Sequence, residues 1–382
     1  MARSEIYLNH AGTSWPKPAV VNEACQVAVN VPPSQWLQRF NEAHRAIADY
    51  FGVPDHNQLL LTPGCTSALS VAIGDAFIPA GQRVLTSHWE HHALMRPLQE
   101  LAASGVQVQQ IPTGPQSPGG DFEEPIDLAW LKKELEKRDV AMVAITAACN
   151  VTGQLLPYQE VIHLARAAGC TVLIDAAQVV GWQKLNFASL GADMVAFGGH
   201  KGLQAPWGIG GLYIADTAQM QCIVSTCSLP GTGGADRAPT KPRPGYCDVG
   251  SVDQVALAGL HASVRVLAAQ RGVSHLSEGR VKIQKIRRAL ADIRQVRTFC
   301  NGSDCVPSVA FSVEGKTSTQ VAEHLAANGL IVGSGLHCAA TAHETLGTQT
   351  TGLVRISVGL EQPDEQIEQA ADVLRASLKD YS

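Results

Sequence analysis

A repeated alternation of short apolar runs and helix-like stretches constrains the fold of this chain most strongly. Between the apolar runs lie segments with helical spacing of apolar residues, for example residues 158–168. Such alternation is typical of a mainly parallel sheet covered by helices on both faces. The sequence therefore predicts an α/β fold with a mainly parallel seven-stranded sheet, its strands at residues 59–61, 83–86, 106–111, 141–146, 171–174, 194–197 and 211–214.

Two of these strands end on ionisable side chains. The strand at 171–174 is followed by Asp175, and the strand at 194–197 runs into a glycine-rich loop that carries Lys201. In an open α/β sheet, ligands bind at the carboxyl ends of the strands. Lysine can form a Schiff base with an aldehyde, and a carboxylate keeps a basic ring nitrogen protonated. The pair therefore predicts a site for pyridoxal 5'-phosphate.

A third segment has the pattern of a phosphate site. Residues 63–68, with the sequence PGCTSA, turn from a strand into a helix. Free backbone amides and a hydroxyl group at the beginning of a helix can bind phosphate. We therefore expect Thr66 to be a ligand of the cofactor's phosphate.

Motifs spread over nearly the whole chain resemble those of one enzyme family. In chain order they are IYLNHAGTSWPKP, LTPGCTSAL, EHHAL, CNVTGQLLP, LIDAAQ, GGHKG, GSVD, SGLHCA and LVRIS. In these motifs the chain resembles class V aminotransferase-like pyridoxal phosphate enzymes of fold type I, and among them the short-loop, group II-like cysteine desulfurase and selenocysteine lyase family. The resemblance implies a PLP-dependent transferase with a smaller α+β C-terminal domain, which acts as a homodimer.

The resemblance also assigns contacts with the cofactor. It implies that His91 stacks on the cofactor ring and shuttles protons, and that His200 binds the phosphate. It places Asn150 and Gln178 near the phenolic oxygen and the substrate. It further implies that Ser251 reaches the phosphate of the neighbouring subunit.

The same resemblance implies that two more residues act on the substrate. Arg355 lies in an apolar strand, where an unpaired charge costs several kcal/mol, and is expected to bind the α-carboxylate of the substrate. Cys338 matches the nucleophile whose thiolate attacks the sulfur of bound cysteine. The adjacent His337 is expected to favour the thiolate. Glycines around Cys338 and the stretch 341–351 predict a mobile loop.

The combined interpretation is a PLP-dependent cysteine desulfurase. It would convert L-cysteine into L-alanine and leave a persulfide on Cys338, with selenocysteine as a second substrate. Lys201 would transfer the proton at the α-carbon, Asp175 would maintain the electron-withdrawing ring, and His91 would assist in proton transfer. Arg355 and Asn150 would bind the substrate, and a sulfur-acceptor protein is the expected partner.

Departures from the family pattern leave other reactions open. The relatives have Asp-Asn-Ala-Ala-Thr where this chain has NHAGT at residues 9–13, and residues 31–36 replace a Gly- and Arg-rich loop. Gly333 stands where an arginine is common, and Gly198 where a serine or threonine is. A lyase, epimerase or aminotransferase of the same fold that does not use Cys338 covalently stays an alternative. A non-catalytic protein that binds sulfur-transfer partners is the other.

Length and composition indicate a globular enzyme of two domains. The chain has 382 residues, of which 45% are hydrophobic and 16% are charged, so it can bury a large core. We expect an N-terminal arm over residues 1–14, a large cofactor-binding domain over 15–255 and a small C-terminal domain over 256–382.

Charge and cysteine spacing exclude several classes of partner. Against 34 acidic residues stand 29 Lys and Arg, a net charge of −5 with no basic run, so neither nucleic acid nor a membrane is an expected partner. We expect a cytoplasmic protein, because the N-terminal residues have no apolar stretch typical of a signal peptide. The 10 cysteines form no C-x-x-C pair, so no metal site is expected.

Overall fold

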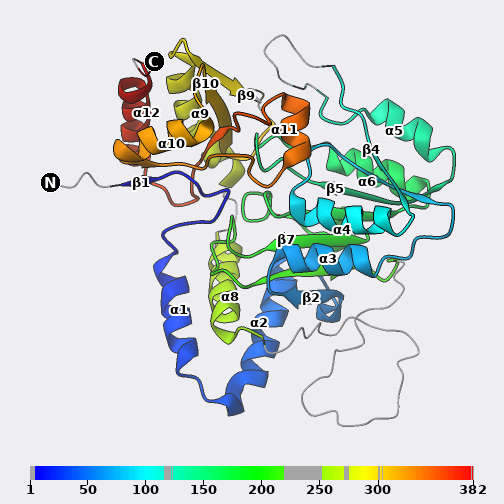
Figure 1. Cartoon of the computed structure of the whole chain (residues 1–382). Coiled ribbons are helices and arrows are strands. Elements are labelled where there is room, and N and C mark those ends of the chain that lie inside the picture. The colour runs from blue at the N-terminus through cyan, green and yellow to red at the C-terminus, as the bar shows by residue number, and fades with distance from the viewer. Residues whose placement is uncertain are drawn as a thin grey trace.

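A seven-stranded sheet in the order β2-β8-β7-β6-β5-β3-β4 forms the centre of the molecule (Figure 1). Neighbouring strands are parallel except at β8, which runs antiparallel to both β2 and β7. The predicted mainly parallel seven-stranded sheet is confirmed. Its strands are β2 (Leu59–Thr62), β3 (Arg83–Thr86), β4 (Gln107–Gln110), β5 (Val140–Thr146), β6 (Thr171–Asp175), β7 (Met194–Gly198) and β8 (Gly210–Ile214).

The computed structural model describes residues 5–115, 122, 124–218, 252–270, 275–299, 302, 304–379 and 381. Helices cover both faces of the sheet (Figure 1). Those that precede the smaller C-terminal part are α1 (Ala19–Val29), α2 (Trp36–Tyr50), α3 (Cys65–Gly74), α4 (His92–Ala103), α5 (Leu128–Leu135), α6 (Tyr158–Ala167), α7 (Phe187–Leu190) and α8 (Gln254–Ala269), with the short 3₁₀ helices η1 (Pro33–Gln35) and η2 (His56–Gln58).

Alternate residues of the central strands are buried on opposite faces of the sheet, as the pleat of a strand requires. Val143 and Ile145 of β5 join the hydrophobic cluster that includes residues of α5 and α6. Met142 and Ala144 of the same strand join the cluster that includes residues of α3 and α4. Both faces of the sheet are therefore covered, which explains why its central strands β5, β6 and β7 are continuous apolar runs.

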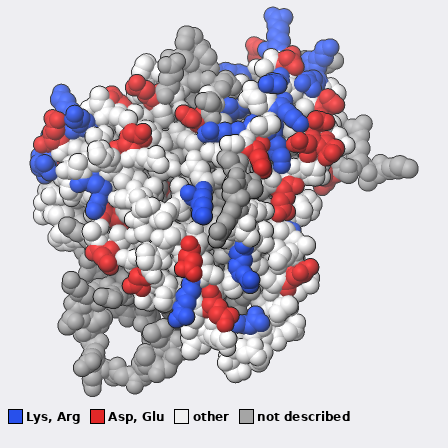
Figure 2. All heavy atoms as spheres, turned by 180° about the vertical axis from the view of Figure 1, so that it is seen from behind, with Lys and Arg blue, Asp and Glu red and all other residues white. Residues whose placement is uncertain are grey.

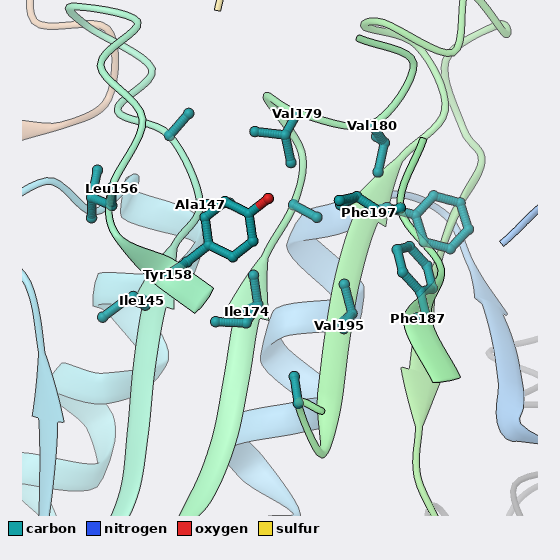
Figure 3. Close-up of a cluster of buried hydrophobic side chains, with 14 of the residues drawn as sticks. Ile145, Ala147, Leu156, Tyr158, Ile174, Val179, Val180, Phe187, Val195 and Phe197 are labelled. Atoms are coloured by element: carbon teal, nitrogen blue, oxygen red, sulfur yellow. The ribbon is translucent and has the colours of Figure 1, made fainter. Parts of the chain in front are cut away.

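Aromatic packing supports strand β7, which leads to the lysine loop. The rings of Phe51 and Phe187 stack with their centroids 4.1 Å apart, and the ring of Phe197 in β7 is tilted against Phe51 at 4.7 Å. Figure 3 shows Phe187 and Phe197 side by side, next to Val180 and Val195. Because these side chains are buried, the end of β7 has little freedom to move.

The C-terminal part has its own sheet and hydrophobic core. Its antiparallel strands run in the order β12-β10-β9, and β11 (Leu330–Ile331) pairs in parallel with β1 (Ile6–Tyr7) of the N-terminal arm. Ile6 and Leu8 lie in this core, so the arm packs with the C-terminal part. The other elements are α9 (His275–Ala291), β9 (Val296–Phe299), β10 (Ser308–Val313), α10 (Ser318–Ala327), α11 (Ala340–Leu346), β12 (Val354–Ser357) and α12 (Asp364–Leu378).

The expected division of the chain into an arm (1–14), a large domain (15–255) and a small domain (256–382) stays a prediction. Helix α8 lies at the expected boundary between the two domains. Asp253 begins the helix, since its Oδ1 accepts hydrogen bonds from the N–H groups of Val255 (3.0 Å) and Ala256 (2.9 Å). The helix packs against α1 and α2, and its Leu257 and Leu260 belong to the core of the large sheet. This packing favours a boundary after α8 rather than before it.

Charged side chains of both signs are interspersed on the face seen in Figure 2. In the part of the chain that the structure describes, no helix has the length and apolar character needed to cross a membrane. Within the same residues, no group of three or more His, Cys, Asp and Glu side chains is arranged to hold a metal ion.

Candidate active site

A cavity of about 460 Å³ lies at the carboxyl ends of β5, β6 and β7. The last residues of these strands, Thr146, Asp175 and Gly198, line it, and so do residues of the C-terminal part. This is the sheet edge at which the sequence predicts a ligand. Ser251 lies outside the described residues. The structure brings together on the cavity wall the other predicted site residues, Thr66, His91, Asn150, Asp175, Gln178, His200, Lys201, Cys338 and Arg355.

Asp175 is a buried carboxylate in the cavity wall, close enough to Lys201 for each to influence the pKa of the other. Its side chain is only 4% exposed, and its Oδ1 accepts hydrogen bonds from the Ala177 N–H (2.9 Å) and the Cys65 thiol (3.4 Å). Burial raises the pKa of the Asp175 carboxyl, while the Ala177 N–H and the nearby Lys201 lower it. Burial lowers the pKa of Lys201, and Asp175 raises it. Each of these two buried groups therefore favours the charged form of the other, whereas burial disfavours both charged forms.

The beginning of helix α3 offers unoccupied hydrogen-bond donors to the cavity. Within the described part of the chain no side chain caps this helix, so its first backbone N–H groups have no capping partner there. A Cβ atom added to Gly64, the preceding residue, would meet no atom of the described residues within 4 Å, which leaves open space for a ligand. The exposed Thr66 adds a hydroxyl group. The buried Nδ1 of His200 has no hydrogen-bond partner within the described residues. These groups fit a phosphate.

The N-terminal arm holds the loop that carries Lys201. The carbonyl oxygen of His200 accepts hydrogen bonds from the Ser14 N–H (2.9 Å), the Thr13 hydroxyl (3.1 Å) and the Lys17 ammonium (3.1 Å). Burial lowers the pKa of Lys17 to about 8. Because two residues of the arm, together with Lys17, bind the peptide group just before Lys201, they fix the backbone from which this side chain projects.

Gln178 also contacts the arm. Its Nε2 donates a hydrogen bond to the Ala11 carbonyl oxygen (3.2 Å). Both residues line the cavity. The arm therefore contributes directly to the cavity wall.

His91 is a neutral imidazole at the beginning of helix α4. Its Nδ1 accepts a hydrogen bond from the Ala93 N–H (3.0 Å), so the ring carries its proton on Nε2. Burial and the nearby Lys201 lower its pKa to about 4. An uncharged ring on the cavity wall can pack face to face with a flat aromatic ligand. Its stacking on the cofactor stays a prediction.

Arg355 has hydrogen-bond donors left over for a ligand. It lies in β12 with only 5% of its surface exposed, and its Nη1 binds the backbone carbonyl of Asn150. Its Nη2 donates to Oδ1 of Asn9 (3.0 Å), whereas no described residue accepts from its Nε. Burial lowers its pKa to about 10, so the guanidinium is charged at neutral pH. This geometry fits a carboxylate ligand.

Cys338 is an exposed free thiol on a backbone that is tightly held. Its carbonyl oxygen accepts from the His92 N–H (2.7 Å), and the carbonyl of His337 accepts from Nδ2 of Asn150 (2.7 Å). Both His337 and Cys338 adopt left-handed backbone angles, with φ of +48° and +57°. Side chains other than glycine adopt such angles rarely, so these two hydrogen bonds hold the thiol in a specific pose.

Two expectations about this segment are corrected by the structure. The stretch 341–351 is not a simple mobile loop, because helix α11 covers its first part and buries Ala342 and Leu346 in the large core. The sequence suggests a loop there because seven residues give too short a pattern to detect a helix.

The second correction concerns His337, which does not favour the thiolate by its charge. Its Nε2 forms a hydrogen bond with the carbonyl of Leu353 (2.9 Å), and burial together with Arg355 lowers its pKa to about 3. The ring is therefore neutral at physiological pH and tied to the neighbouring chain. Its role here is to hold the segment that carries Cys338.

Four contributors to the site have no role assigned from the sequence. Cys65 binds Asp175, Asn9 binds Arg355, Lys17 holds the lysine loop, and the N–H of His92 holds the carbonyl of Cys338. Each lies in a motif that carries the family resemblance, and Cys65 and His92 are next to Thr66 and His91, which were assigned roles. These neighbours could have drawn attention to Cys65 and His92, but the partners of all four residues lie far away in the sequence.

Comparisons with known proteins show the family to which this chain belongs. The family model Aminotransferase class-V matches residues 6–370. The chain is 28% identical to a protein of Vibrio cholerae described as "Probable cysteine desulfurase", over 95% of this chain and 91% of that protein. It is 26% identical to the cysteine desulfurase of Yersinia pestis (strain Angola), over 87% and 84%. A third such relative, from Mycolicibacterium paratuberculosis, is 27% identical, but the chain spans only 47% of that longer protein.

Solved structures have the same fold. The apo cysteine desulfurase of Thermococcus onnurineus superimposes with a TM-score of 0.83 at 24% identity, over 98% of this chain and 95% of that one. The cysteine desulfurase CsdA of Escherichia coli gives 0.82 at 24%, over 99% and 96%. With the family model matched almost end to end, the chain belongs to the class V aminotransferase family, whose members use pyridoxal phosphate.

Proposed function

We propose that this chain is a PLP-dependent cysteine desulfurase that converts L-cysteine into L-alanine and leaves a persulfide on Cys338. The observation that carries this proposal is the position of Cys338. Its exposed thiol lines the same cavity as Lys201, Asp175 and Arg355, on a backbone held in a left-handed conformation. The names of relatives that match most of the chain at 26% and 28% identity support the same activity.

The cavity residues fit the cofactor that this reaction needs. When bound, pyridoxal phosphate supplies an aldehyde for a covalent link to an amine and a protonated ring that withdraws electrons from the substrate's α-carbon. The buried donors and acceptors without partners, together with the open beginning of α3, are the support for this assignment. The groups that would hold it are Lys201 at the aldehyde carbon, Asp175 at the ring nitrogen, His91 on the ring face, Asn150 and Gln178 near the phenolic oxygen, and Thr66 and His200 at the phosphate. By the family resemblance, Ser251 of the neighbouring subunit would also bind the phosphate.

The substrate would be oriented by its carboxylate. Arg355 provides a buried cation with an unpartnered Nε, and Asn150 provides a buried Oδ1 without a partner among the described residues. Carboxylate binding at Arg355 fixes one end of cysteine, so its α-carbon is directed toward Lys201. Because burial lowers the pKa of Lys201, the neutral amine is accessible as a base for the proton on the α-carbon.

Cys338 would then accept the sulfur atom. Its thiolate supplies an electron pair to the substrate sulfur, so a bond forms between the two sulfur atoms while the bond between sulfur and the β-carbon breaks. The β-carbon keeps the electron pair of the broken carbon–sulfur bond and takes up a proton. Cysteine and one thiol thus yield alanine and one persulfide, with atoms and electrons in balance, and a sulfur-acceptor protein would remove the outer sulfur. Selenocysteine would react in the same way.

A product assay on L-cysteine tests the proposal. We expect alanine, with sulfur appearing first as the Cys338 persulfide and, with a reductant, as sulfide. Pyruvate and ammonia in place of alanine would identify a lyase that does not use Cys338 covalently. Transfer of the amino group to an oxo acid would identify an aminotransferase.

The charge of Asp175 is expected to matter more for turnover than for cofactor binding. Asp175→Asn keeps the size of the side chain and its hydrogen bond with Ala177, but an amide no longer favours a protonated ring nitrogen. We expect turnover to fall by about 100-fold or more, with the cofactor retained. Steady-state kinetics with cofactor content measured in the same sample tests this, and unchanged turnover would refute the role.

We also infer a symmetric homodimer with two sites. Ser251 matches a residue that reaches the phosphate of the partner subunit in the family, so each site would need both chains. Light scattering at the assay concentration is expected to show a dimer, and Ser251→Ala to raise the cofactor concentration needed for half saturation. A fully active monomer would contradict this inference.

A further inference from the structure

Arg355 is a buried cation whose two hydrogen-bond partners among the described residues are both neutral. The oxygens that accept its hydrogen bonds are the backbone carbonyl of Asn150 and Oδ1 of Asn9, the latter at 3.0 Å. Its Nε has no acceptor within the described part of the chain. A buried charge that is not neutralised by the protein attracts an anionic ligand more strongly than a paired one does. The full positive charge of Arg355 is thus available to a ligand.

Asn9 is placed for this contact by the arm. Its backbone carbonyl accepts hydrogen bonds from the N–H groups of Gly12 (3.0 Å) and Thr13 (3.3 Å), and its backbone forms a bridge with Ser357, two residues beyond Arg355. The amide side chain therefore projects from a fixed backbone rather than from a free terminus.

Gly333 provides the space that the Asn9 side chain occupies. Its N–H donates to the carbonyl of Arg355 (3.0 Å), and the N–H of Arg355 donates to the carbonyl of Gly333 (2.8 Å), so the two residues lie side by side. A Cβ atom at position 333 would lie 2.8 Å from Oδ1 of Asn9 and 3.2 Å from Cε1 of His337. Any larger residue would therefore displace the amide from Arg355.

We propose that Asn9 sets the affinity of the Arg355 site for a carboxylate ligand, because its neutral amide orients the Arg355 guanidinium without cancelling its charge. The inference relies on the proposed function only for the identity of the substrate. Asp at this position would have nearly the same shape. The relatives have Asp at this position, commonly together with an arginine where this chain has Gly333. Because this chain lacks that second cation, an Asp at position 9 would form a buried ion pair with Arg355 in advance and would repel the carboxylate of an incoming amino acid.

The decisive variant is Asn9→Asp, with 3-mercaptopropionate as the probe. This probe carries the carboxylate and the thiol of cysteine but no amine, so it cannot be linked covalently to the cofactor. For the holoenzyme, we expect the dissociation constant measured by calorimetry to rise by about 10- to 100-fold, since like charges then face each other in a buried site. We expect KM for cysteine to rise to a similar extent with little change in kcat. This result is expected when the bound substrate and the transition state lose the same binding energy.

Two further variants separate charge from geometry. Asn9→Ala removes the acceptor but leaves the charge of Arg355 uncancelled, so its effect should be several-fold smaller than that of Asn9→Asp. Asn30→Asp adds the same charge at an exposed position at the end of α1, and should leave the binding of the probe unchanged. Circular dichroism checks that each variant is folded. Should Asn9→Asp fail to fold, Gly333→Ala tests the position of the Asn9 amide instead, because it displaces the amide without any change of charge.

The outcomes distinguish this inference from the proposed reaction. Equal affinity of Asn9→Asp and the unmodified protein for 3-mercaptopropionate would overturn it, as would an equal loss in Asn9→Asp and Asn9→Ala. In the Gly333→Ala test, unchanged affinity would overturn it too. If cysteine gives pyruvate while Asn9→Asp still weakens binding of the probe, the role of Asn9 holds and the desulfurase proposal fails.

Discussion

Replacing Cys338 by serine is expected to lower the rate of alanine formation from cysteine by about 1000-fold or more. Serine has nearly the same size, but its hydroxyl group is a far weaker nucleophile toward sulfur and is not ionised at neutral pH. The residues that would hold the cofactor and the carboxylate are unchanged, so the visible absorbance and the binding of cysteine should be retained. Rapid-quench measurement of alanine, with absorbance spectra of the same samples, checks both parts.

A matched control is available in Cys25→Ser. Cys25 is also a partly exposed free cysteine, but its Sγ lies near the carbonyl of Val255 (3.5 Å), outside the cavity. This variant should keep full activity. The reaction of Cys338→Ser with selenocysteine should be impaired less than that with cysteine, because selenium leaves more readily without help from a nucleophile. Sulfide release at the normal rate from Cys338→Ser, with pyruvate as co-product, would show that Cys338 is a bystander.

Replacing Lys201 by alanine should have the largest effect of all, because two functions are lost at once. The side chain is both the expected covalent anchor of the cofactor and the base for the α-proton, so turnover should fall by about 10⁴-fold or more. The absorbance band of the purified protein should change as well. A control is Lys184→Ala, which removes an exposed lysine that does not line the cavity.

The anchor itself can be identified by mass spectrometry. Reduction of the unmodified protein with borohydride should fix the cofactor on the peptide that contains Lys201. In Lys201→Ala, no peptide should carry it. A cofactor fixed on another lysine, or a Lys201→Ala protein with unchanged colour and turnover, would refute the assignment.

The large sheet could be predicted from the sequence because its central strands β5, β6 and β7 are continuous apolar runs bounded by loop residues. For the same reason the sequence locates Asp175, at the end of β6, and Lys201, in the loop after β7, at one edge of the sheet. Strand β11 is too short to show a pattern, and it exists only because it pairs with β1 at the other end of the chain. Helix α11 is likewise stabilised by burial in the core rather than by its sequence pattern.

The site contacts that the sequence did not reveal join residues that are remote along the chain. Asn9 reaches Arg355, and Cys65 reaches Asp175, only through the folding of the arm and of α3 onto the sheet. The neutral state of His337 could not be predicted either, because its pKa depends on burial and on Arg355. Residue types indicate the chemistry, whereas the tertiary structure sets the partners and the charges.

The most direct test of the central claim is a search for the persulfide after brief exposure of the unmodified protein to L-cysteine without a reductant. Peptide mass spectrometry should find one additional sulfur atom on the peptide that contains Cys338, and the same sample should contain one alanine for each sulfur bound. No additional sulfur on Cys338, with pyruvate accumulating in place of alanine, would contradict the account.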